Sequence, residues 1–125
     1  MRLLYLWGPV LAHMALIFAA SSSSDTTAIP SAIPDKVTHF AVYALLGVLL
    51  LRAVAGGRRS GVTWSGVLVS IVVATLYGIT DEWHQSFVPN RAPDASDVLA
   101  DLAGASTGAV VTALTTRLGA SRRET

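Results

Sequence analysis

The sequence predicts an all-α, polytopic membrane protein with four transmembrane helices in a bundle, and two observations support this fold class. Of the 125 residues, 52% are hydrophobic and only 14% are charged, whereas soluble proteins carry about 25% charged residues. Four separate segments are also apolar over roughly 20 residues each, the length that an α-helix needs to cross a bilayer. The mean hydropathy of +0.54 agrees with this prediction.

The four predicted spans are separated by sequences that break helices. A serine run with Pro30 and Pro34 follows the first span, a glycine- and arginine-rich turn follows the second, and Pro89 and Pro93 bound the turn after the third. Because the chain is short, all of it forms one domain, residues 1–125. We expect the spans at residues 3–20, 37–55, 62–80 and 98–118.

The first apolar segment has two interpretations. We expect it to remain as a transmembrane span, because it is long for the apolar region of a secretory signal and Gly8-Pro9 interrupts it. The alternative is a signal peptide over Met1 to Ser22, in which Arg2 is the basic region and Ala19-Ala20-Ser21 lies near the cleavage site. Cleavage would leave three spans with unchanged orientation.

The distribution of charge predicts that both termini are cytoplasmic. Seven of the nine Lys and Arg residues lie at the N-terminus, around the second loop or at the C-terminus, and only Lys36 and Arg91 lie in the other two loops. Positive residues concentrate on the cytoplasmic side of membrane proteins. Seven of the eight acids lie on the opposite side, and we expect a polar site there.

Small residues mark the expected contact faces between helices, because membrane helices associate through close packing. We expect these faces to pack inside one bundle, although the GxxxG pair could instead serve a homo-oligomer. The small residues recur every four positions in the third and fourth spans: Gly66, Ser70, Ala74 and Gly78, then Ala100, Gly104 and Gly108.

Polar side chains from three helices converge on the outer end of the predicted bundle. Residues three, four or seven positions apart share a helix face. Charged groups within membrane spans are costly and usually functional. The predicted binding cluster, called the polar cluster below, consists of Lys36, His39, Tyr43, Asp81, Glu82, His84, Gln85, Arg91, Asp97 and Asp101.

Three motifs follow one another between residues 35 and 108. They read Asp35-Lys36-x-x-His39-Phe40-x-x-Tyr43-x-x-Leu46-Gly47, then Asp81-Glu82-x-His84-Gln85-x-Phe87-x-Pro89-x-Arg91, then Asp97-Val98 with Gly104. Together they resemble the VanZ-like family of small bacterial membrane proteins. The resemblance implies a cell-envelope function linked to teicoplanin resistance, but it supplies no reaction. Asp101 departs from the family pattern, which usually has Asn there.

The cluster allows several chemistries. Glu82 or Asp81 with His84 could act as an acid/base pair in a membrane hydrolase or transferase, but no nucleophile stands beside them in a recognisable motif. His39, Asp81, His84 and Asp97 could hold a divalent metal through nitrogen and oxygen ligands. Their spacing matches no diagnostic metal motif, so no cofactor is predicted.

Arg91 could bind a phosphate or carboxylate, or pair with Asp94 or Asp97. Asp97 could also cap the fourth helix.

These observations predict a protein of the bacterial cytoplasmic (inner) membrane that modulates sensitivity to teicoplanin-type glycopeptides. The expected partners are the bilayer and a lipid-linked envelope precursor or a lipoglycopeptide, whose anionic group would meet Lys36 and Arg91. A net charge of +1 argues against nucleic acid. The alternatives are the membrane enzyme and a structural subunit of a membrane complex.

Overall fold

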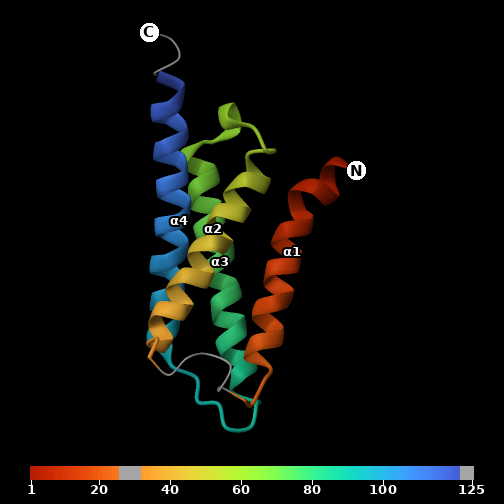
Figure 1. Cartoon of the computed structure of the whole chain (residues 1–125), viewed down its shortest axis with the longest axis vertical. Coiled ribbons are helices and arrows are strands. Elements are labelled where there is room, and N and C mark those ends of the chain that lie inside the picture. The colour runs from red at the N-terminus through yellow and green to blue at the C-terminus, as the bar shows by residue number, and fades with distance from the viewer. Residues whose placement is uncertain (26–31, 122–125) are drawn as a thin grey trace.

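A computed structural model describes residues 1–25 and 32–121. Within these residues the chain forms four long helices and no strand (Figure 1). Each long helix is apolar enough to cross a membrane, so the predicted fold class is confirmed. The helices are α1 (Arg2–Ser21), α2 (Asp35–Val54), α3 (Trp64–Gln85) and α4 (Ala95–Ser121), with a single 3-10 turn, η1 (Arg59–Gly61).

The helices extend beyond the predicted spans, mainly at one end of the bundle. α3 continues past Thr80 to Gln85, and α4 begins at Ala95 rather than at residue 98. Hydropathy detects only the apolar part of a helix, whereas the backbone hydrogen bonds continue until the chain turns before Pro89. Asp81, Glu82, His84 and Gln85 are therefore helical side chains with fixed directions.

The helices run alternately up and down. The start of α1, the α2–α3 connection and the end of α4 lie at one end, and the other two connections lie at the opposite end (Figure 1). The end that carries the α2–α3 connection is called the basic end below. There Arg52 lies 4.4 Å from the ring centroid of Tyr5, and Arg117 lies 5.0 Å from the ring centroid of Trp64. Arg122, Arg123 and Glu124, which contributed to the orientation argument, lie outside the described residues.

α2 forms the centre of the bundle and packs most extensively against α4. A Cβ placed on Gly104 or Gly108 would collide with the backbone carbonyls of Phe40 and Ala44 on α2. Gly47 faces the Ala105 carbonyl of α4 in the same way. The small-residue face of α4 is thus used inside the chain, as predicted, because only residues without a side chain permit such close approach.

α1 packs against α2 and, less extensively, against α3. Leu6, Val10 and Ile17 are its buried apolar residues. The Tyr77 hydroxyl of α3 donates a hydrogen bond to the Met14 carbonyl at 2.6 Å, which fixes the register of α1 against α3.

Candidate functional site

The polar cluster lies at the end of the bundle that carries the α1–α2 and α3–α4 connections, called the polar end below. Asp81, Glu82 and Gln85 of α3 are buried there, together with Asp97 and Asp101 of α4. Four carboxyl groups are therefore withdrawn from solvent in helices long enough to span a membrane. Burial of that many ionisable groups is costly unless hydrogen bonds or opposite charges compensate for it.

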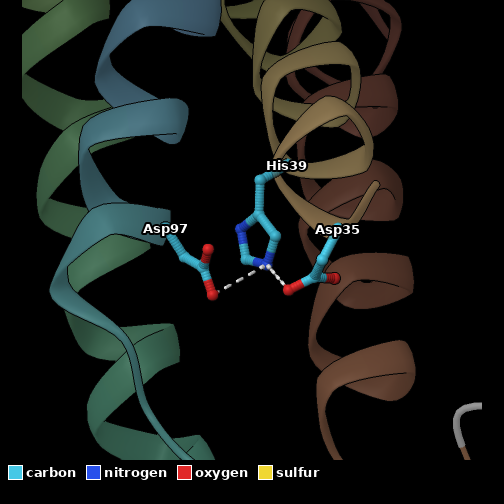
Figure 2. A group of neighbouring side chains, drawn as sticks. All are labelled: Asp35, His39 and Asp97. Atoms are coloured by element: carbon cyan, nitrogen blue, oxygen red, sulfur yellow. Dashed lines mark ion pairs between the residues drawn. The ribbon is translucent and has the colours of Figure 1, made fainter. Parts of the chain in front are cut away.

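His39 is the centre of the α2–α4 half of the cluster. Its Nδ1 lies 2.8 Å from Asp101 Oδ1. Its Nε2 lies 3.9 Å from Asp35 Oδ2 and 3.8 Å from Asp97 Oδ2 (Figure 2). Asp35 and His39 are four residues apart on α2, and Asp97 and Asp101 are four apart on α4, so each helix presents two groups on one face.

Lys36 connects the start of α2 to the start of α4. Its ammonium group donates to Asp94 Oδ2 and to Asp97 Oδ1, both at 3.0 Å. The Asp94 carboxylate also accepts the Ser96 backbone N–H at 2.8 Å. Hydrogen bonds from the Ser96 hydroxyl and backbone, followed by that from Lys36, lower the pKa of Asp94 to about 2.

The interaction with Ser96 corrects one expectation. Asp97 does not cap α4, because the helix begins at Ala95 and Asp97 lies within its first turn. Asp94 precedes the helix and occupies the capping role, since its carboxylate accepts an N–H that has no partner inside the helix. The Asp97 carboxylate is thereby left to face Lys36 and His39.

Glu82 links α3 to the same junction. Its Oε2 accepts the Asp94 backbone N–H at 3.0 Å. Its Oε1 is buried without a hydrogen-bond partner among the described residues, and so are Asp101 Oδ2 and the Tyr43 hydroxyl. Both unpartnered carboxylate oxygens belong to side chains that are at most 6% exposed. Polar atoms of this kind indicate a place where a ligand, an ion or water binds.

A second half of the cluster faces α1. The Ser21 hydroxyl donates to Asp81 Oδ1 at 2.5 Å, and Gln85 donates to Asp81 Oδ2 at 3.4 Å. His84 Nε2 lies 3.0 Å from the Ser22 hydroxyl, and its ring stacks on Phe18 at 4.5 Å. The serine run predicts only a helix break, and no local pattern in the sequence reveals these hydrogen bonds.

The division into two halves separates the residues that were grouped as metal candidates. Asp81 and His84 contact α1, whereas His39 and Asp97 lie between α2 and α4. The group that comes within 4.8 Å in the described part of the chain is Asp35, His39 and Asp97. The spacing of four residues between Asp35 and His39 was the sequence signal that could have identified Asp35.

Arg91 is bonded to the end of α1 and not to an acid. It donates from Nε to the Ser23 carbonyl and from Nη2 to the Ala20 carbonyl, both at 3.0 Å. It therefore satisfies carbonyls at the C-terminal end of α1, where a positive charge is favourable. The predicted pairing with Asp94 or Asp97 is not formed, and the two cations expected to receive an anion are both engaged with protein oxygens.

A cavity of about 90 Å³ opens between α1, α2 and α3 at the polar end. A single water needs roughly 10–15 Å³ of such space, so the cavity has room for a few waters or one small functional group. It is too small to enclose an antibiotic or a whole lipid-linked precursor. Its polar lining includes Asp35, His39, Tyr43, Asp81, Gln85 and Arg91.

The charges of the polar end do not balance. Arg91 is bonded to carbonyls, so Lys36 is the one Lys or Arg among the described residues that pairs with the carboxylates. His39 is the other group that can carry a positive charge there, through its contacts with Asp35, Asp97 and Asp101. Against these two side chains stand Asp35 and Asp94 with the four buried acids. This arrangement is suited to a positively charged or proton-donating group rather than to an anion.

Comparison with known proteins gives the same family as the motifs. The chain matches the family model described as VanZ/LLP1 over residues 6–116. No curated protein and no solved structure matches significantly. The matched region contains all four helices except their outermost residues, and it includes the whole polar cluster. The chain therefore belongs to the VanZ/LLP1 family, as a protein with four helices that can span a membrane.

Proposed function

We propose that this protein resides in the cytoplasmic membrane of a bacterium, with both termini inside, and modulates sensitivity to teicoplanin-type glycopeptides. The polar cluster would be its working site on the extracytoplasmic face. The observation that carries this proposal is the burial of four carboxyl groups at one end of an apolar bundle. Packing between apolar helices does not require buried carboxyl groups, and ionisable groups in spans are usually functional.

The size and charge of the site limit what it receives. A cavity of about 90 Å³ admits only one small group of a larger ligand. Because carboxylates outnumber their cationic partners, the matching group would be cationic or a hydrogen-bond donor. A lipid-linked envelope precursor or a lipoglycopeptide would then be held by such a group, with its lipid portion in the surrounding bilayer.

Replacement of Glu82 by Gln tests this role. Glu82→Gln keeps the shape of the side chain and an acceptor for the Asp94 N–H, but it removes the charge. In a glycopeptide-sensitive host, wild type should raise the inhibitory concentration of teicoplanin more than that of vancomycin. Glu82→Gln should lose most of that protection, since a weakened charge-assisted bond costs about 1–3 kcal/mol, roughly 5-fold or more in binding.

Glu124→Gln provides a matched control, because the same chemical change is made after the end of α4. All strains must carry equal amounts of folded membrane protein. Protection that is absent for wild type, or that survives in Glu82→Gln, would contradict the proposal. If Glu82→Gln loses protection only in proportion to a lower amount of folded protein, the structural-subunit alternative would be favoured.

A membrane enzyme is the second candidate, and the His39–Asp101 pair favours it. A carboxylate that accepts from Nδ1 orients the ring and leaves Nε2 available as a base. Both Nε2 and the cavity lie at the polar end. Loss of a general base reduces rates by 10²–10⁴-fold. An enzyme would therefore lose nearly all activity in His39→Gln, whereas a binding protein would keep part of its protective effect.

A further inference from the structure

We propose that Asp35, His39 and Asp97 form a binding site for a divalent metal cation of the zinc class. One ligand atom from each side chain lies within 4.8 Å of the others. Nitrogen and carboxylate oxygen donors together are typical of zinc sites, whereas calcium and magnesium select oxygen alone. This set differs from the sequence-based grouping, which combined His39 and Asp97 with two residues that face α1.

The orientation of His39 is the first reason. A carboxylate has no proton to give at its oxygen, so His39 Nδ1–H donates to Asp101 at 2.8 Å. When the ring is positively charged, Nε2 also carries a proton, and a metal ion would have to displace that proton. The Nε2 lone pair would then be directed toward the region between Asp35 and Asp97 (Figure 2). Histidine ligands of zinc characteristically donate their other N–H to a carboxylate, which fixes the ring and strengthens the metal bond.

The two oxygens of Asp97 have separate partners, which is the second reason. Lys36 donates to Oδ1 at 3.0 Å, while Oδ2 faces His39 Nε2 at 3.8 Å. The ammonium group therefore orients the carboxylate without occupying the ligand atom. At 3.8 and 3.9 Å the contacts of Nε2 are too long for hydrogen bonds. Ligands of a tetrahedral zinc ion lie about 3.4 Å apart. A zinc ion would therefore draw each carboxylate oxygen a few tenths of an ångström closer to Nε2. It would draw the two oxygens, which lie within 4.8 Å of each other, together by up to about 1.4 Å.

The unbalanced charge is the third reason, and it comes from side chains other than the three ligands. Glu82 is 6% exposed, its Oε1 has no partner among the described residues, and it lies within electrostatic reach of His39, Asp97 and Asp101. Asp101 is 1% exposed and has one unpartnered oxygen. A divalent cation on the three ligands would offset this buried negative charge, and its fourth ligand could come from the cavity that Asp35 and His39 line.

Direct binding tests this site without reference to antibiotic sensitivity. The protein would be prepared without a polyhistidine tag, reconstituted in nanodiscs, stripped with a chelator and titrated with Zn²⁺ against a fluorescent zinc chelator. Wild type should bind one zinc per chain beyond that bound by empty nanodiscs. Ca²⁺ and Mg²⁺ at the same concentration should not displace it. Co²⁺ should give the visible absorption of a four-coordinate site.

Four substitutions separate the ligands from their surroundings. His39→Gln and Asp35→Asn should each weaken zinc binding at least 100-fold, and Asp35 is exposed, so its variant should still fold. Asp101→Asn should weaken binding about 10–100-fold by releasing the ring. His13→Gln is a matched histidine change on α1, where Nε2 lies 2.9 Å from the Val42 carbonyl outside the polar cluster, and it should bind as wild type does. The proposal is overturned if wild type binds no stoichiometric zinc, or if Asp35→Asn binds zinc as tightly as wild type.

Discussion

His39 and Lys36 join α2 to α4 because each faces carboxylates of the neighbouring helix. His39 contacts Asp101 at 2.8 Å, and Lys36 bridges Asp94 and Asp97 at 3.0 Å. Two side chains from adjacent turns of α2 thus reach three acids around the first turns of α4. Such a network specifies the position of α4 beside α2 more narrowly than apolar packing does, since each polar atom requires one partner.

The pH dependence of stability should reveal the contribution of Asp94. Because the pKa of Asp94 is lowered to about 2, its ionised form stabilises the fold above its ordinary value of 3.8. This stabilisation should disappear as the pH falls through about 2. Thermal unfolding of wild type and Asp94→Asn in detergent should therefore differ above pH 4 and converge near pH 2. A constant difference over that range would contradict the assignment.

The residue scale also shows what the sequence could predict. Helical spacing correctly brought His39, Asp97 and Asp101 to one end of the bundle, because these residues share faces on their own helices. It could not predict that Arg91 bonds to the carbonyls of α1, or that Asp81 pairs with Ser21. Those partners depend on the path of a loop and on the rotation of α1, which no local pattern encodes.

At the scale of the elements, the α2–α4 contact is the most extensive in the bundle. Gly47, Gly104 and Gly108 each face a backbone carbonyl of the opposite helix. A backbone atom cannot move aside as the tip of a side chain can. The repeat of small residues predicted this contact from the sequence, whereas hydropathy alone misplaced the ends of α3 and α4, because it does not register the polar turns that continue each helix.

A glycine-to-alanine pair tests the contact. Gly104→Ala should push α4 away from Phe40 and destabilise the bundle by about 1–3 kcal/mol, the usual cost of overpacking. Gly8→Ala on α1 is the matched control, because nothing lies within 4 Å of a Cβ there. Thermal unfolding in detergent should show a lower midpoint for Gly104→Ala only. Equal unfolding midpoints for Gly104→Ala and Gly8→Ala would contradict the close packing of α4 against α2.

At the scale of the whole molecule, charge is separated along the bundle. The start of α1, the end of α4 and the arginines of the basic end lie opposite the buried acids (Figure 1). Positive residues favour the cytoplasmic side of a membrane, so the polar end should face outward. The sequence could predict this polarity because it depends only on which loops carry charge and on the even number of spans.

Cysteine labelling tests the orientation. Because the sequence contains no native cysteine, only the introduced thiol can react with the label. Ala92→Cys introduces a thiol at an exposed position of the polar end, and Ser60→Cys does so in the α2–α3 connection. A membrane-impermeant maleimide should label Ala92→Cys in intact cells. It should label Ser60→Cys only after the cells are permeabilised. The reverse pattern would place the polar cluster in the cytoplasm and exclude an outer-face role.

The central claim is that the buried polar end, rather than the bundle as a whole, gives this protein its function. Asp97 is the most direct place to test it, because it lies between Lys36 and His39. Teicoplanin susceptibility should be compared between cells with wild type and cells with Asp97→Asn, at equal amounts of folded protein. We expect wild type to protect and Asp97→Asn to lose most of that protection. Equal protection by both proteins would contradict the claim.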